Sequence, residues 1–179
     1  GLARLVPGAT VFAFDTDPAA AARCAALAAL NGVADRVVVG GLCSPDRLQE
    51  LTTPGAVVVC DIEGAELDLL DPARVPALAA ATLVVECHDF LPAPTSGPLA
   101  DRFAATHEVT RVDAAGRDPN AFPFLRGLPP VQKLFAVWEG RPGPTPWLVL
   151  TPRRPAPDDR PFCDTAVPPE PLICRSGCA

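Results

Sequence analysis

Short apolar runs alternate with helix-forming segments along this chain, and that alternation limits the possible folds more than any other feature. The runs are rich in Val and Leu and are mostly apolar at every position, as in strands whose two faces are both covered by helices. Strands are predicted at residues 10–14, 36–39, 56–60, 82–86, 108–112 and 147–150, and helices at residues 19–30, 44–51, 65–70, 73–80 and 96–106, with 131–138 either helix or strand. This order predicts an α/β fold with a mostly parallel, doubly wound sheet.

Helix boundary signals support the same segmentation. Asp17 before Pro18 predicts an N-cap and a first helical residue, and Asn31 with Gly32 predicts a left-handed stop. Ser96 is likewise expected to cap the helix that follows it. The run at residues 108–112 alternates polar and apolar side chains, which indicates an edge or antiparallel strand.

Composition excludes several classes of protein. The 179 residues are 49% apolar and 20% charged, which fits one domain that buries a core. The net charge of -6 disfavours nucleic acid as a partner, and no apolar stretch approaches the length of a membrane span. We expect residues 1–152 to form the domain and the Pro-rich residues 153–179 to be a disordered tail.

The cysteines indicate a reducing compartment. Four of the seven lie in apolar or helical contexts at wide spacing, as buried thiols do, and we expect a cytoplasmic protein. Three more lie in the Pro-rich tail without a nearby His, which disfavours a zinc site there. The four are Cys24, Cys43, Cys60 and Cys87, and the three are Cys163, Cys174 and Cys178.

Acidic residues gather where the predicted strands end. In an open α/β sheet, ligands bind outside the carboxyl ends of the strands. A crowd of carboxylates beside an imidazole is costly without a ligand, a cation or a shared proton. The residues concerned are Asp15, Asp17, Asp61, Glu63, Glu86, His88 and Asp89. The plainer interpretation is turn and cap chemistry for Asp15 and Asp17, and a helix-dipole role for Glu63 and Glu66.

The string VFAFDTDPAAAARCAALAALNGVADRVVV, followed by CDIEGAE and VVECHDF, resembles the class I S-adenosylmethionine-dependent methyltransferases and is closest to their FkbM-like branch. The resemblance spans about residues 11–150 and is most specific at residues 61–66. It implies a Rossmann-like fold in which Asp15 holds the cofactor ribose, with Asp17 and Asp61 also at the cofactor. The implied function is methyl transfer to an oxygen, less readily a nitrogen, of a small-molecule or glycosyl acceptor.

One part of the family pattern has no counterpart in this sequence. The family's first strand and the Gly-rich loop after it would precede Leu2, and that strand lies between the family's second and fourth strands. We therefore expect the 179 residues by themselves to be inactive and to bind the cofactor weakly or not at all. The alternative is a methyltransferase-like binding or scaffold protein that has lost cofactor binding. A nucleotide-dependent oxidoreductase is less compatible with the segment at residues 61–66.

Two mechanisms would activate an acceptor hydroxyl. His88 could act as general base, oriented by Asp61 or Glu86, since imidazole titrates near physiological pH. Alternatively, these three residues could bind a divalent metal, although Mg²⁺ prefers oxygen ligands over His88. The residue types favour the base, and the plainer interpretation of His88 is a structural hydrogen bond at a strand end.

Other residues are expected to have structural roles. His107 falls between a helix and a strand and is expected at the surface. The aromatic residues of the C-terminal half are expected to pack in the core or in a lid. They are Phe122, Phe124, Phe135, Trp138 and Trp147.

Overall fold

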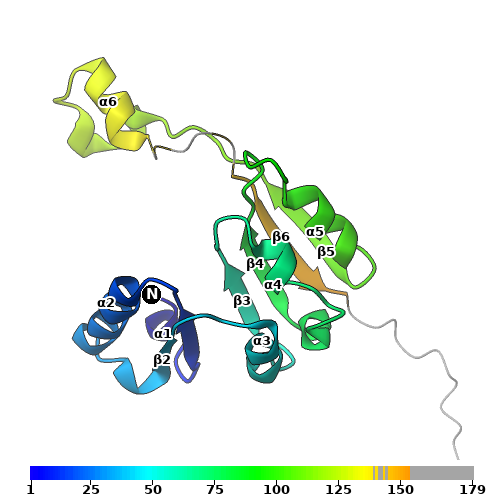
Figure 1. Ribbon diagram of the computed structural model, residues 1–179. Helices are drawn as coiled ribbons and strands as arrows, with labels where there is room; N and C mark the ends of the chain where they lie inside the picture. The colour runs from blue at the N-terminus through cyan, green and yellow to red at the C-terminus, as the bar shows by residue number, and fades with distance from the viewer. Residues whose placement is uncertain (139, 141–142, 144, 154–179) are drawn as a thin grey trace, which may run out of the picture.

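The computed structural model describes residues 1–138, 140, 143 and 145–153 (Figure 1). The predicted tail lies outside this part of the chain except for Arg153, and so do its three cysteines. The α-helices are α1 Leu2–Leu5, α2 Pro18–Leu30, α3 Pro45–Leu51, α4 Glu66–Leu69, α5 Ser96–Phe103 and α6 Pro130–Val137. The strands are β1 Val11–Phe14, β2 Val37–Gly40, β3 Val57–Cys60, β4 Thr82–Glu86, β5 His107–Val112 and β6 Trp147–Pro152. Short 3₁₀ helices are η1 Ala34–Arg36, η2 Pro76–Ala80, η3 Pro119–Ala121 and η4 Pro123–Leu125.

The strands form two sheets within the described residues. β1 and β2 pair in parallel, and the second sheet has the order β3-β4-β6-β5. β3 and β4 are parallel, whereas β6 is antiparallel to both of its neighbours. The α/β class and the antiparallel edge strand at β5 are confirmed. The prediction of a mostly parallel, doubly wound sheet is confirmed in part, because β1 with β2 and β3 with β4 are parallel, whereas β6 enters antiparallel between β4 and β5.

The main core lies on the four-stranded sheet. It joins alternate residues of β4 and β6 to side chains from α5 and from the turns around η2. Its fully buried members include Leu70, Val75, Leu78, Leu83, Leu150 and Phe103. A much smaller cluster of Ala3, Ala28 and Val33 holds α1 and α2 to the two-stranded sheet.

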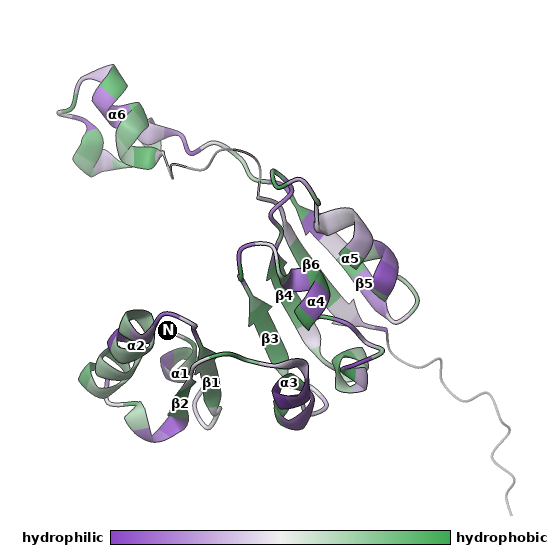
Figure 2. Cartoon of the chain, viewed as in Figure 1, coloured by the Kyte–Doolittle hydropathy of each residue, from purple (hydrophilic) through white to green (hydrophobic). Residues whose placement is uncertain are grey.

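One face of β3 is open, contrary to the prediction that helices cover both faces of every strand. Val57 and Val59 are 62% and 53% exposed, while Val58 and Cys60 point into the core. Successive side chains of a strand point to opposite faces. Figure 2 shows this strand as uniformly apolar, so its composition alone does not reveal which face is covered.

The helix caps follow the sequence signals at α2 and α3 but not at α5. Asp17 Oδ1 accepts a 2.9 Å hydrogen bond from the Ala19 N–H, and Gly32 takes a positive φ of 65° just past α2. The prediction that Ser96 caps α5 is wrong, because Ser96 is itself the first helical residue. Asp89, distant in sequence, accepts from the Ser96 N–H at 2.9 Å and from the Thr95 N–H at 3.1 Å.

We predict that Asp89→Ala destabilises the protein by about 1 kcal/mol, the usual cost of losing a cap. Asp89→Asn should cost less, because the amide oxygen can still accept from both N–H groups. Urea unfolding measures both differences. Asp113→Ala is the control, since it removes the 2.7 Å partner of Arg111 without touching the cap. Equal stability of wild type and Asp89→Ala would contradict the assignment.

Several helices are shorter than the sequence signals suggest. The helix expected at residues 73–80 is reduced to η2, because Pro76 cannot donate to a preceding turn and its ring clashes with that turn. α4 has four residues, and α5 ends at Phe103. The stretch at residues 131–138, for which the sequence allows helix or strand, is helical up to Val137, and α6 begins at Pro130.

His107 is fully buried, which corrects the prediction that it lies at the surface. Its Nε2 lies 3.0 Å from the Ala81 carbonyl oxygen and its Nδ1 2.8 Å from the Thr106 hydroxyl. Its ring meets Phe103 edge to face at 5.2 Å. The ring can be buried because both nitrogens have partners, which removes the main cost of taking a polar group out of water.

Three of the five aromatic side chains that are predicted to pack in the core or in a lid are exposed, so these three do not lie in the core. Phe124, Phe135 and Trp138 are 80%, 65% and 64% exposed. α6 contacts η3, and Figure 1 shows it away from the four-stranded sheet. An apolar helix face predicts that something covers it. Within the described residues, no sheet or helix of the main core does so.

The two buried cysteines are unreactive by position. Burial raises the pKa of Cys60 to about 12 and that of Cys87 to about 11, with nearby carboxylates adding to both shifts. Cys24 and Cys43 are partly exposed, and all four are free thiols. The prediction of packed, unpaired cysteines is confirmed for Cys60 and Cys87.

No described helix has the length and apolar character that crossing a membrane requires.

We predict that iodoacetamide at pH 8 alkylates Cys24 in the folded protein but leaves Cys60 and Cys87 unmodified. The thiolate is the nucleophile, and at this pH the two buried thiols remain protonated. Peptide mass spectrometry with and without denaturant gives the comparison. Alkylation of Cys60 at the rate of Cys24 in the folded protein would contradict the prediction.

Candidate functional site

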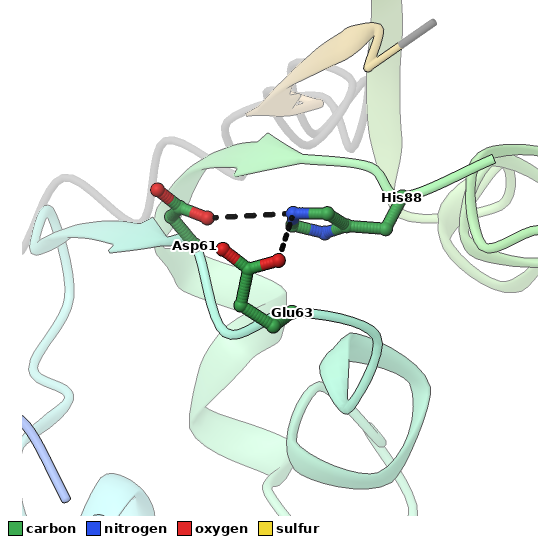
Figure 3. Close-up of side chains that lie close together, drawn as sticks. All are labelled: Asp61, Glu63 and His88. Carbon is green, nitrogen blue, oxygen red and sulfur yellow. Dashed lines mark ion pairs between the residues drawn. The ribbon is translucent and has the colours of Figure 1, made fainter. Parts of the chain in front are cut away.

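The candidate site lies at the carboxyl ends of β3 and β4. The register pairs Cys60 with Val85, so Asp61 and Glu86 continue side by side past the last pairs of these parallel strands. His88 follows two residues beyond Glu86, and Figure 3 shows its ring directed at Asp61 and Glu63. The sequence prediction that Asp61, Glu86 and His88 gather at one sheet edge therefore agrees with the geometry.

His88 lies at the centre of this group. Its Nδ1 is 2.8 Å from Glu66 Oε1, and its Nε2 is 3.2 Å from Glu63 Oε2 and 3.7 Å from Asp61 Oδ1. The side chain is only 2% exposed, and Phe90 meets the ring edge to face at 5.9 Å. Both ring nitrogens thus face carboxylates, one buried and two open to solvent.

Glu66 is the most deeply buried carboxyl group of the site. It is fully buried, and its Oε1 accepts a 3.0 Å hydrogen bond from the Gly64 N–H in addition to its contact with His88. Its Oε2 has no hydrogen-bond partner. A buried, half-satisfied carboxylate costs free energy unless a positive charge lies nearby.

The carboxyl groups of Asp61 and Glu86 lie near each other where β3 and β4 end. The pKa of Asp61 is raised above its ordinary value, first by partial burial and then by the charge and hydrogen bond of Glu86; His88 acts in the opposite direction. Glu86 is 2% exposed, whereas Asp61 is about half exposed. Asp61 is thus the member of the pair that a ligand can reach.

The loop after β3 reverses sharply to bring its carboxylates to His88. Glu63 has a positive φ of 56°, rare for a residue with a side chain, and Gly64 has a φ of 101°. A Cβ on Gly64 would also approach Leu91 Cδ1 to 2.5 Å. The Glu-Gly pair therefore permits the reversal that places Glu63 and Glu66 on opposite sides of the imidazole.

Asp15 and Asp17 lie at the end of β1, in the other sheet. Asp15 Oδ1 accepts a 2.8 Å hydrogen bond from the Asp17 N–H, and Asp17 caps α2 and pairs with Arg23 at 3.5 Å. Both side chains are exposed. Their local contacts are those of the turn and cap interpretation, and no described contact joins either residue to the group around His88.

The sequence groups Glu63 with the other acidic residues at the strand ends but does not predict that Glu63 and Glu66 contact His88. The plainer interpretation of both is a helix-dipole role, whereas Glu63 precedes α4 and contacts the ring. The spacing around Gly64 is visible in the sequence and could have suggested a reversal. The complete burial of Glu66 could not be seen, because Glu66 packs against His88, which lies 22 residues further along the chain.

The geometry restricts the base mechanism. A general base needs a nitrogen that a substrate proton can reach. Nε2 is covered by Asp61 and Glu63, so a hydroxyl reaches it only if Glu63 moves aside. A hollow of about 410 Å³ lies elsewhere, against α6 at Arg117 and Phe135.

We predict that Glu63→Gly stabilises the protein by about 1 kcal/mol relative to Glu63→Ala. Both substitutions remove the carboxylate, but only glycine relieves the left-handed backbone, which costs about 1 to 2 kcal/mol for other residues. Urea unfolding of the two variants gives the difference directly. If Glu63→Ala is as stable as Glu63→Gly, the loop does not hold this conformation in solution.

Comparison with protein-family models and with curated proteins gave no match to this chain.

Proposed function

We propose that this protein belongs to a class I, FkbM-like type of S-adenosylmethionine-dependent methyltransferase that acts on an oxygen of a small-molecule or glycosyl acceptor. The observation that carries the proposal is the break between the two sheets. β1 and β3 lie at sheet edges and each pairs on one side. This is where the sequence resemblance puts the family's first strand, between the strands that end in Asp15 and Asp61.

The residues at the ends of β1 and β3 suit the groups of the cofactor. Asp15 is exposed, and the Asp17 N–H fixes one of its oxygens, so its carboxylate has a defined orientation for a ribose diol. Asp17 is engaged in its cap, which makes Asp15 the better candidate of the two. Asp61 is half exposed at the neighbouring sheet's edge and would face the methyl-donor end. The cofactor supplies an electrophilic methyl group when bound.

The group around His88 suits the acceptor. A hydroxyl must lose its proton as it attacks, and the charged cluster of Asp61, Glu86 and His88 offers sites for that proton. The raised pKa of Asp61 brings this carboxyl closer to neutral pH than an ordinary aspartate. The acidic surroundings favour a neutral acceptor over an anionic one.

The competing proposal is a binding or scaffold protein with the same fold and no cofactor. The turn contacts of Asp15 and the cap role of Asp17 are equally compatible with it. Cofactor binding separates the two proposals.

We predict that the protein expressed from its complete reading frame binds S-adenosylhomocysteine, and that Asp15→Ala weakens this binding about tenfold or more. That factor corresponds to losing hydrogen bonds to a charged group. Isothermal titration calorimetry in the presence of a chelator is the measurement. Asp15→Asn keeps an acceptor for the Asp17 N–H and so preserves the turn. If Asp15→Asn also weakens S-adenosylhomocysteine binding, loss of the turn cannot explain the effect of Asp15→Ala.

Asp35→Ala is the matched control. It also removes an exposed carboxylate, but at the other end of α2, in η1. It should bind as wild type does. No binding by the wild-type protein would favour the scaffold alternative. Equal binding by wild type and Asp15→Ala would remove Asp15 from the cofactor site.

A further inference from the structure

Three side chains at the sheet edge offer one ligand atom each within a single small volume. Asp61, Glu63 and His88 place a carboxylate oxygen, a second carboxylate oxygen and an imidazole nitrogen within 4.8 Å of one another (Figure 3). Ligand bonds of about 2.1 Å place neighbouring ligand atoms about 3.0 to 3.5 Å apart in octahedral or tetrahedral geometry. The separations from Nε2, 3.2 Å and 3.7 Å, are close to this range.

The orientation of His88 is an independent observation that points to a ligand. The side chain of His88 is only 2% exposed, and its Nδ1 lies against the buried carboxyl group of Glu66. When the Nδ1 proton is donated to Glu66, neutral imidazole presents the Nε2 lone pair to two carboxylates that can only accept. This buried nitrogen then has no donor among the described residues, and a cation would satisfy it.

Glu66 completes an arrangement common around protein-bound metals. A metal-binding His usually donates its other ring N–H to a carboxylate, which fixes the tautomer and raises the basicity of the ligand nitrogen. Glu66 Oε1 lies where such a partner is needed, and its Oε2 is buried without a hydrogen bond. Positive charge at Nε2 would also offset the cost of burying this carboxylate.

We propose that Asp61, Glu63 and His88 bind a divalent transition-metal ion such as Mn²⁺ or Zn²⁺, with Glu66 as the partner that orients His88. One nitrogen and two oxygen ligands suit these ions better than Mg²⁺, which prefers oxygen alone. Asp61 is 49% exposed and Glu63 81% exposed, so the ion can enter from solvent and retain coordination positions for water or a substrate.

The metal site does not require the proposed methyl transfer, but it refines that function if both hold. This refinement rests on the proposed function. In it, the acceptor hydroxyl would bind the ion, and the ion would lower the pKa of that hydroxyl. His88 would then serve as a ligand, because one lone pair cannot bind a metal and accept a proton.

The experiment is a titration of the metal-free protein, expressed from its complete reading frame, with Mn²⁺ and without cofactor. Electron paramagnetic resonance follows the free Mn²⁺ signal, and pulsed measurements detect nitrogen coupling from a bound imidazole. We expect one specific site with nitrogen coupling. Glu63→Gln should weaken binding at least about tenfold, the scale of effects seen around metal sites.

Glu63→Gln is the informative variant because its side chain is mostly exposed, so folding does not depend on it. Glu108→Gln is the matched control, an exposed carboxylate on β5 with the same change of charge, and should bind as wild type does. Circular dichroism verifies that each variant is folded.

Three results would overturn the proposal. They are no Mn²⁺ binding by the wild-type protein, equal weakening by Glu63→Gln and Glu108→Gln, and binding without nitrogen coupling. The metal titration contains no cofactor and the S-adenosylhomocysteine titration contains a chelator, so either proposal can fail while the other stands.

Discussion

The contact between Glu66 and His88 organises the candidate site. It links the loop that leaves β3 to the segment that leaves β4, at 2.8 Å and out of contact with water. Because one ring nitrogen is held by a buried carboxyl group, the other must point toward the open edge of the sheet. The positions of Asp61 and Glu63 relative to the ring follow from this orientation and from the reversal at Gly64.

The same contact sets the electrostatic problem that the site must solve. Asp61, Glu63 and Glu66 lie around one imidazole, and Glu86 adds a fourth carboxyl group beside Asp61, whose pKa is raised by partial burial and by this neighbour. Glu63 has a left-handed backbone conformation, which is unfavourable for a residue with a side chain, and its carboxylate faces the ring. A strained loop that brings negative charge together is more easily explained by a ligand than by stability, since neither feature favours folding.

Local signals in the sequence predicted most of the elements but not how they are covered. The strands, the α2 cap at Asp17 and the stop at Gly32 depend on short-range chemistry, and all are present. His107 is buried although the sequence predicts it at the surface, and Val57 and Trp138 are exposed although the sequence predicts them covered. Burial depends on partners from distant segments, which local signals do not specify. The start of α5 was misassigned for the same reason, since its cap comes from Asp89 and not from the adjacent Ser96.

The sequence by itself determined that acidic residues and one histidine follow the strands, because a strand's end is marked by local composition. It therefore predicted that Asp61, Glu86 and His88 share an edge once β3 and β4 pair in parallel. Only the tertiary structure decided that Glu63 lies against Nε2 of His88 and that Glu66 is buried behind the ring. Those placements depend on a left-handed backbone and on side-chain packing between segments more than 20 residues apart, which no local pattern encodes.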